Sequence, residues 1–126
     1  MSDNLPRFHR LAVGDSDSVE RTFRQEDVRV WARLVAAAKP DGHVPEPLIA
    51  GLFSCLLGEK LPGHGTNYLK QHLEMHASAR IEEPLTARVT VTRLRPDKAL
   101  VNLDTECRGE GGRLLCSGDA LVLFAR

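Results

Sequence analysis

One segment of the sequence, Glu46–Gly58, is apolar on nearly every side when it is drawn as a helix. Its large apolar residues, and the small residues between them, are Leu48, Ile49, Leu52, Phe53, Leu56 and Leu57, with Ala50, Gly51, Ser54 and Cys55. A helix without a polar face is normally buried, and small side chains let a neighbouring element approach it closely. The sequence therefore predicts a central buried helix around which the rest of the chain folds.

Four strands are predicted after this helix, with turns between them. The segment Leu85–Leu94 alternates apolar and polar residues with the period of two that a half-buried strand requires. Pro96-Asp97 and Gly109–Gly112 are turn sequences that favour hairpins between neighbouring strands. The four predicted strands are Asn67–Met75, Leu85–Leu94, Leu100–Cys107 and Leu114–Phe124. Hairpin-connected strands beside one buried helix indicate an α+β fold with an antiparallel sheet.

The part of the chain before the buried helix is expected to begin with an irregular tail, residues 1–17. A short strand, Val19–Phe23, follows it, and the apolar positions of the segment Gln25–Ala38 then repeat at helical spacing. Pro40 ends this first helix, because a proline disfavours the helical conformation of the residue before it. With 126 residues in all, we expect one domain over residues 1–126.

The charge balance and the cysteine content argue against several classes of protein. The 17 basic and 17 acidic side chains cancel, whereas a nucleic-acid binder needs clustered cations, so no nucleic-acid partner is expected. No apolar stretch has membrane-spanning length, and the first residues lack the apolar core of a signal peptide. The three cysteines show no paired spacing, and Cys55 lies in an apolar run. These features predict reduced, buried thiols in a cytoplasmic protein that has no membrane partner.

Motifs within and after the central helix carry a family resemblance. The helix sequence from Pro47 to Gly58 is followed by a Pro-Gly-x-Gly turn at residues 62–65 and by Tyr68-Leu69-x-Gln71 in the next predicted strand. In these motifs, and in register as far as the segment 118–122, the chain resembles the MaoC-like (R)-specific enoyl-CoA hydratases. The resemblance implies a hot-dog fold, in which an antiparallel sheet wraps around a central helix.

The resemblance also implies that the standard catalytic residues of that family are missing. Its members close the first helix with an Asp-x-Asn-Pro-x-His motif, whose Asp and His hold the water that adds across the enoyl double bond. Aligning the motif proline with Pro40 places Ala37 at the Asp and Gly42 at the His. Alanine cannot take a proton from water.

A second loss falls at the start of the central helix. There the family has a His-Gly step, and the glycine amide binds the thioester oxygen. Counting back from the helix places Glu46 at this His and Pro47 at the glycine, and proline has no N–H to donate. The loop before the helix is also shorter than the family's loop by roughly ten residues, judged from the usual lengths of such connections.

Three titratable residues lie beside the lost positions, namely Asp41, His43 and Glu46. A histidine and a carboxylate in a cleft perform acid–base chemistry near neutral pH, so these residues are the candidate catalytic groups. The alternative is a solvated turn, in which Asp41-Gly42 makes the turn and Glu46 stabilises the helix N-terminus. The sequence leaves both interpretations open.

The resemblance assigns substrate and partners as well. Ser54, Leu57 and Leu121 match acyl-chain-pocket positions of the family, and ordinary core residues explain them equally. The implied ligand is an acyl thioester of coenzyme A or of acyl-carrier protein. The implied assembly is a homodimer with sheets joined edge to edge, or a hetero-oligomer with an active homologue. No redox cofactor is implied, and no metal is expected, because no third ligand accompanies His72 and His76. The arginines of the predicted sheet form either a solvated face or a contact for the coenzyme's phosphates: Arg80, Arg88, Arg93 and Arg95.

Three hypotheses for the function follow. The first is hydration of an enoyl thioester, or dehydration of a 3-hydroxyacyl thioester, at a rearranged site around His43 with Asp41 or Glu46. The second is a non-catalytic subunit that binds acyl thioesters or pairs with an active hydratase. The third is a thioesterase, and it is the weakest because only Glu46 offers a carboxylate to activate water.

Overall fold

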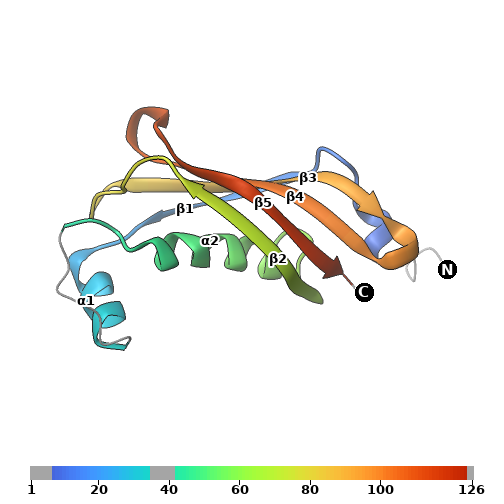
Figure 1. Cartoon of the computed structure of the whole chain (residues 1–126), viewed down its shortest axis with the longest axis horizontal. Helices are drawn as coiled ribbons and strands as arrows, with labels where there is room; N and C mark the ends of the chain where they lie inside the picture. Colours follow the sequence, from blue (N-terminus) through green and yellow to red (C-terminus); the bar gives the residue numbers. More distant parts are fainter. Residues whose placement is uncertain (1–6, 35–41, 125–126) are drawn as a thin grey trace.

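A five-stranded antiparallel sheet curves over one long helix, with the strand order β1-β3-β4-β5-β2 (Figure 1). The computed structural model describes residues 7–34 and 42–124. Its helices and strands are β1 (Ser16–Thr22), α1 (Gln25–Leu34), α2 (Glu46–Glu59), β2 (Thr66–Met75), β3 (Pro84–Arg95), β4 (Leu100–Arg108) and β5 (Leu114–Phe124). A sheet wrapped around a central helix confirms the predicted α+β hot-dog fold.

The core lies between α2 and the concave face of the sheet, which we call the inner face. Ile49, Phe53, Leu56 and Leu57 of α2 are fully buried. Alternate strand residues meet them from the sheet: Leu85, Ala87, Val89, Val91, Val101, Leu103, Ala120 and Val122. Because successive strand residues point to opposite faces, the residues between these form the opposite, outer face.

The sheet covers only one side of α2. Gly51, Ser54 and Cys55 lie on the other side and are exposed. The prediction that Cys55 is a buried thiol is therefore wrong, whereas Cys107 and Cys116 are buried as expected. A helix that is apolar all round gives no signal in its sequence for which side the sheet will cover.

The chain before α2 is more ordered than we expected. β1 begins at Ser16, because its backbone pairs with β3 from Ser16 opposite Thr90 onward. Within the tail that we expected to be irregular, Arg7–Arg10 forms a 3-10 turn that buries Phe8. α1 begins at Gln25 as predicted, but its predicted end and the turn through Asp41 lie outside the described residues.

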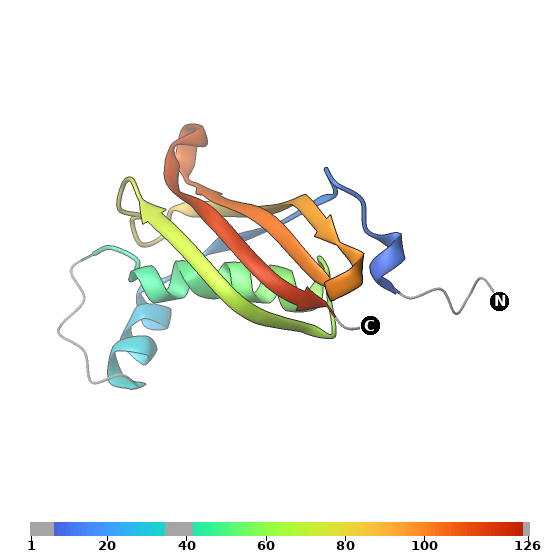
Figure 2. The same ribbon diagram turned by 45° about the vertical axis from the view of Figure 1, so that its right-hand side comes forward.

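Three segments lie at the end of the molecule where α2 begins. They are α1, the loop 76–83 between β2 and β3, and the β4–β5 hairpin, which contains the 3-10 turn Glu110–Gly112 (Figures 1 and 2). The other hairpin, at Pro96–Lys98, lies at the opposite end. In the described part of the chain, neither helix has the length and hydropathy needed to cross a membrane.

Candidate active site at the start of the central helix

The segment 42–44 enters α2 along the loop 76–83 and is held there by backbone hydrogen bonds. The Val44 N–H donates to the Ala79 carbonyl at 2.8 Å, and the Ile81 N–H donates to the Gly42 carbonyl at 3.1 Å. Between these bonds His43 and Arg80 form an antiparallel bridge. Gly42 has φ of 92°, which a glycine adopts without strain. The turn thus fixes the backbone of His43, whose side chain is exposed.

The first turn of α2 offers few backbone donors. Pro45 is the N-cap, Glu46 is the first helical residue, and Pro47 follows it without an N–H. The Leu48 N–H donates to the Pro45 carbonyl at 3.0 Å. The Glu46 N–H makes no hydrogen bond with a described residue, so it is the donor that this turn leaves for a ligand.

The charge of the exposed Glu46 acts on Cys116, a buried thiol of β5. Burial raises the pKa of the Cys116 thiol, and the negative charge of Glu46 raises it further. Burial likewise raises the pKa of Cys107, to about 12, with a smaller contribution from Cys116. These thiols stay protonated at neutral pH, so they supply no nucleophile beside Glu46.

Two of the three candidate catalytic residues lie in the described part of the chain. His43 and Glu46 are three positions apart at one end of the fold, and both are exposed. Asp41, the third candidate, lies outside the described residues. The alternative of a solvated turn remains, since exposure suits it equally.

The three predicted substrate-binding residues do not converge on one site within this chain. Ser54 is exposed on α2, and its hydroxyl donates a side-chain hydrogen bond to the phenol oxygen of Tyr68 of β2. This bond partly offsets the rise in the pKa of Tyr68 that its burial causes. Leu57 is fully buried between α2 and the sheet. Leu121 lies on the outer face, between the inward-facing Ala120 and Val122.

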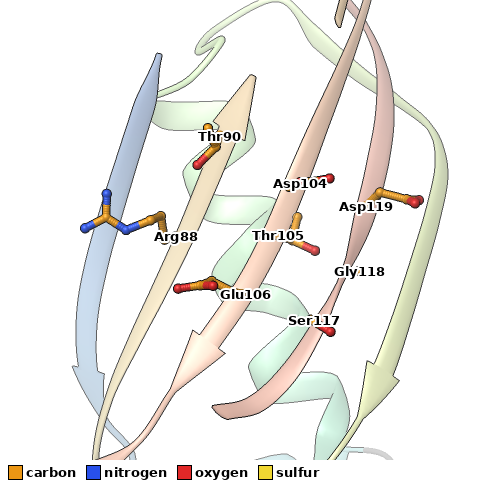
Figure 3. Close-up of a pocket in the computed structure, with 8 residues that line it drawn as sticks. All are labelled: Arg88, Thr90, Asp104, Thr105, Glu106, Ser117, Gly118 and Asp119. Carbon is orange, nitrogen blue, oxygen red and sulfur yellow. The ribbon is translucent and has the colours of Figure 1, made fainter. Parts of the chain in front are cut away.

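Two hollows open on the outer face, away from α2. One, of about 500 Å³, is lined by polar and charged residues of β3, β4 and β5 (Figure 3): Arg88, Thr90, Asp104, Thr105, Glu106, Ser117, Gly118 and Asp119. Asp104 and Asp119 are direct cross-strand neighbours there. A charged hollow does not suit an acyl chain, because burying a charge against apolar groups is costly.

The arginines of the sheet do not form one basic patch. Arg80 pairs with Glu110 at 3.6 Å, near the start of α2. Arg88 donates to the Ser16 hydroxyl at 2.9 Å on the outer face. Arg93 and Arg95 line the second hollow, of about 470 Å³, together with Lys70 and two carboxylates. The four residues therefore do not form a single site for the coenzyme's phosphates.

Metal-ligating side chains do not gather within the described residues. His72 is exposed, and the His76 imidazole is hydrogen-bonded to the Ser117 hydroxyl at 2.8 Å.

Two polar contacts near α2 could not be predicted from the sequence. One is the contact between Tyr68 and Ser54. The other is the buried carboxylate of Glu83, which binds groups from two loops. Their partners are distant in sequence, and single residue types carry no signal for such pairings.

Known proteins resemble this chain over nearly its whole length. The (R)-specific enoyl-CoA hydratase of Rhodospirillum rubrum is 34% identical over 134 residues, which cover 94% of this chain and 92% of that protein. The (R)-specific enoyl-CoA hydratase of Aeromonas caviae is 44% identical over 128 residues, covering 89% and 94%. A solved (R)-hydratase from A. caviae, involved in PHA biosynthesis, superposes with a TM-score of 0.84 and 34% identity, covering 89% of this chain and 96% of that one.

No family model matches the chain. The alignment with the R. rubrum hydratase is 134 positions long, which exceeds the 126 residues of this chain, so the relative has positions without a counterpart here. The identity and the coverage nevertheless extend over the complete hot-dog scaffold. The chain therefore belongs to the MaoC-like family of (R)-specific enoyl-CoA hydratases and related dehydratases.

Proposed function

We propose that this protein hydrates enoyl-CoA thioesters, and dehydrates 3-hydroxyacyl-CoA in the reverse direction, at a rearranged site built on His43 and Glu46. The observation that carries the proposal is the position of these two residues at the start of α2, in a scaffold 44% identical to a hydratase. Asp41 precedes them in sequence and is the third candidate of the same segment.

Hydration needs a base for water, an acid for the α-carbon and a donor for the thioester oxygen. The base removes a proton from water while the hydroxyl adds to C3, and the acid delivers a proton to C2. Imidazole and carboxylate side chains suit these roles at neutral pH, and His43 and Glu46 supply one of each. The Glu46 N–H is the donor left to stabilise the charge on the thioester oxygen.

Two observations support a rearrangement of the relatives' site. The R. rubrum hydratase has alignment positions that this chain lacks, and we expect some of them to fall in the loop before α2. Pro47 removes a donor from the second position of α2. A site with one remaining amide donor is expected to turn over more slowly than one with two, because an oxyanion donor contributes a factor of about 10² to 10³.

Turnover of the purified wild-type protein tests the proposal. Crotonyl-CoA and a longer enoyl-CoA are supplied at saturating concentration, and loss of the enoyl absorbance is followed together with the chirality of the product. Formation of (R)-3-hydroxyacyl-CoA supports the proposal, and no loss of absorbance contradicts it. The same enoyl group on acyl-carrier protein identifies the preferred carrier. Release of free thiol would identify a thioesterase instead.

A second candidate is a non-catalytic subunit that binds acyl thioesters or pairs with an active hydratase. The proline at position 47 favours this candidate, since a protein that has lost catalytic activity does not require a donor to the thioester oxygen. Calorimetric binding of crotonyl-CoA without turnover would support this candidate. Turnover by the isolated wild-type protein would exclude it.

A further inference from the structure

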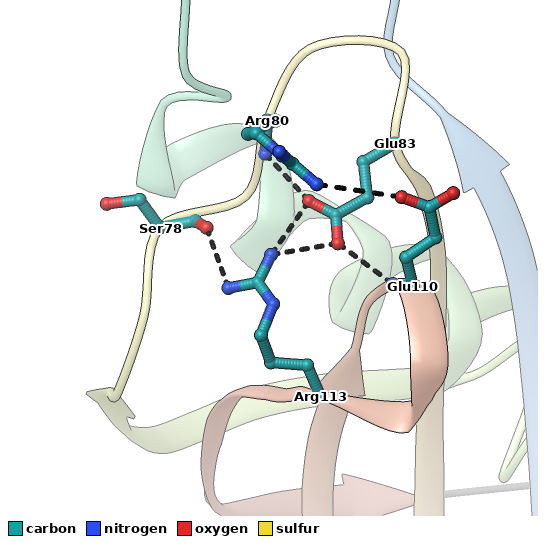
Figure 4. A network of polar contacts seen from close by, with 5 residues as sticks. All are labelled: Ser78, Arg80, Glu83, Glu110 and Arg113. Atoms are coloured by element: carbon teal, nitrogen blue, oxygen red, sulfur yellow. Dashed lines mark hydrogen bonds and ion pairs between the residues drawn. The ribbon is translucent and has the colours of Figure 1, made fainter.

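Glu83 is a buried carboxylate that the proposed chemistry does not use. It precedes β3 at the end of the loop 76–83, and only 3% of it is exposed. Figure 4 shows it between this loop and the β4–β5 hairpin, at the end of the molecule where α2 begins. A buried carboxylate so close to a candidate site needs a physical explanation.

The hydrogen-bonding capacity of Glu83 is taken up by the protein itself. One oxygen accepts the Arg80 N–H at 2.9 Å, and the other accepts the Glu110 N–H at 2.8 Å. The Arg113 Nη2 donates to both oxygens, at 3.0 and 2.9 Å. Burial alone would raise the pKa of Glu83, but these donors outweigh it and lower the pKa. Glu83 is therefore a fully engaged carboxylate and is unsuited to take a proton from water.

These bonds tie two connections of the sheet together. The Arg113 Nη1 also donates to the Ser78 carbonyl at 3.3 Å, and Arg80 pairs with Glu110 at 3.6 Å (Figure 4). The loop 76–83 is thus fixed to the β4–β5 hairpin through both its side chains and its backbone. Gly109 completes the arrangement, since a Cβ at this position would overlap the Glu83 carboxylate.

The fixed loop carries the segment that precedes α2. Ala79 accepts the Val44 N–H, and Ile81 donates to Gly42, on either side of His43. Any shift of the loop therefore moves the His43 backbone and the start of α2 relative to the sheet. The chain of contacts runs from Glu83 through Arg80 and Ala79 to the candidate catalytic segment.

We propose that Glu83 and Arg113 form a positioning pair, which acts through the loop 76–83 to hold His43 and Glu46 in their working geometry. This inference rests on the proposed function. Glu83 is a positioning residue, because both of its carboxylate oxygens are bound by Arg80, Glu110 and Arg113 of the protein. Misplacing a catalytic group by about 1 Å lowers turnover by up to about a hundredfold, so the pair is expected to act on kcat.

The test compares Glu83→Gln with Glu106→Gln as a matched control. Glu106 also binds an arginine, Arg108, at 3.0 Å, but it lies on the outer face away from α2. In Glu83→Gln we expect the Val44 and Ile81 amides to exchange hydrogen on the order of ten times faster, since the loop opens more often. We expect kcat for crotonyl-CoA to fall by ten- to a hundredfold with KM within about twofold of wild type. The Glu106→Gln variant is expected to change none of these quantities.

Should Glu83→Gln fail to fold, Arg113→Lys provides a second variant. It keeps the positive charge and removes the guanidinium group that donates to both oxygens of Glu83. Slow exchange of the Leu103 and Val122 amides in the central strands verifies that each variant is folded. Unchanged exchange at Val44 and Ile81, or faster exchange with unchanged kcat, would overturn the proposal. Absence of turnover in the wild-type protein would instead contradict the proposed function, and the exchange comparison would then decide the positioning claim by itself.

Discussion

Glu46 and Glu83 are carboxylates at the same end of the molecule, but their surroundings suit them to different tasks. Glu83 is buried and accepts hydrogen bonds from Arg80, Glu110 and Arg113. Glu46 is exposed in the first turn of α2, and its backbone N–H has no partner among the described residues. A carboxylate with engaged lone pairs is a poor base, so only Glu46 is available for proton transfer.

The acid stability of the protein is predicted to depend on Glu83. Its pKa is lowered from the ordinary 4.5, because its hydrogen bonds outweigh the effect of burial. A lowered folded-state pKa stabilises the fold above the unfolded-state pKa, and this stabilisation is lost as the pH falls through the folded-state value. We expect the free energy of unfolding of the wild type, measured with urea, to fall more steeply below about pH 5 than that of Glu83→Gln. Equal acid dependence in the two proteins would contradict this assignment.

Near neutral pH, Glu83→Gln is expected to lower the free energy of unfolding. Removing the charge leaves Arg113 with a neutral acceptor in place of an anion and turns an amide group toward the N–H groups of Arg80 and Glu110. Breaking a fully buried ion pair from one side costs about 3 kcal/mol. Because Arg113 is 41% exposed, we expect a smaller loss here. Urea unfolding at neutral pH measures this loss, and a change below about 1 kcal/mol would show that the pair is weak.

Among the elements, those with long apolar segments were predictable from the sequence. The central helix was predicted to begin at Glu46, as observed, and the strand β5 has the predicted bounds. The start of β1 was missed, because Ser16 pairs through backbone groups that leave no apolar pattern. The exposure of Cys55 was mispredicted, because an all-apolar helix does not reveal which side a sheet covers.

The candidate site was only partly predictable. His43 and Glu46 were predicted as neighbours because they are three positions apart, His43 before α2 and Glu46 as its first residue. The contacts of Glu83 with Glu110 and Arg113 join residues 27 and 30 positions apart, and no local pattern encodes them.

Pro47 in the first turn of α2 lacks the N–H that other residues would offer to the thioester oxygen. Substituting Pro47 by Ala provides an N–H at the second position of the helix, beside the Glu46 N–H, which has no partner among the described residues. If the missing donor limits turnover, Pro47→Ala is expected to raise kcat for crotonyl-CoA by about tenfold or more. Steady-state hydration rates measure the effect. A kcat equal to that of the wild type would show that the thioester oxygen is not bound at this turn.

At the scale of the whole molecule, β2 leaves one edge of the sheet open. It is ten residues long, and Tyr68 and Leu69 on it are 37% and 53% exposed. An edge strand carries a row of unpaired backbone N–H and C=O groups, with which a strand of another chain can pair. We therefore expect a homodimer that joins β2 edges, and substitution of Leu69 by Lys is expected to shift it toward the monomer. Light scattering after gel filtration measures the mass, and a wild-type monomer would contradict this expectation.

We propose that hydration in this family member takes place at a rearranged site at the start of α2. The most direct test is kcat/KM for crotonyl-CoA in His43→Ala, compared with His64→Ala as a control. His64 is also exposed but lies beyond the opposite end of α2, where it pairs with Glu59 at 3.7 Å. Loss of an acid–base group costs a factor of about 10² to 10⁴, so His43→Ala is expected to lose at least a hundredfold. We expect wild-type activity in His64→Ala, and equal activity in the two variants would show that His43 does not take part in the reaction.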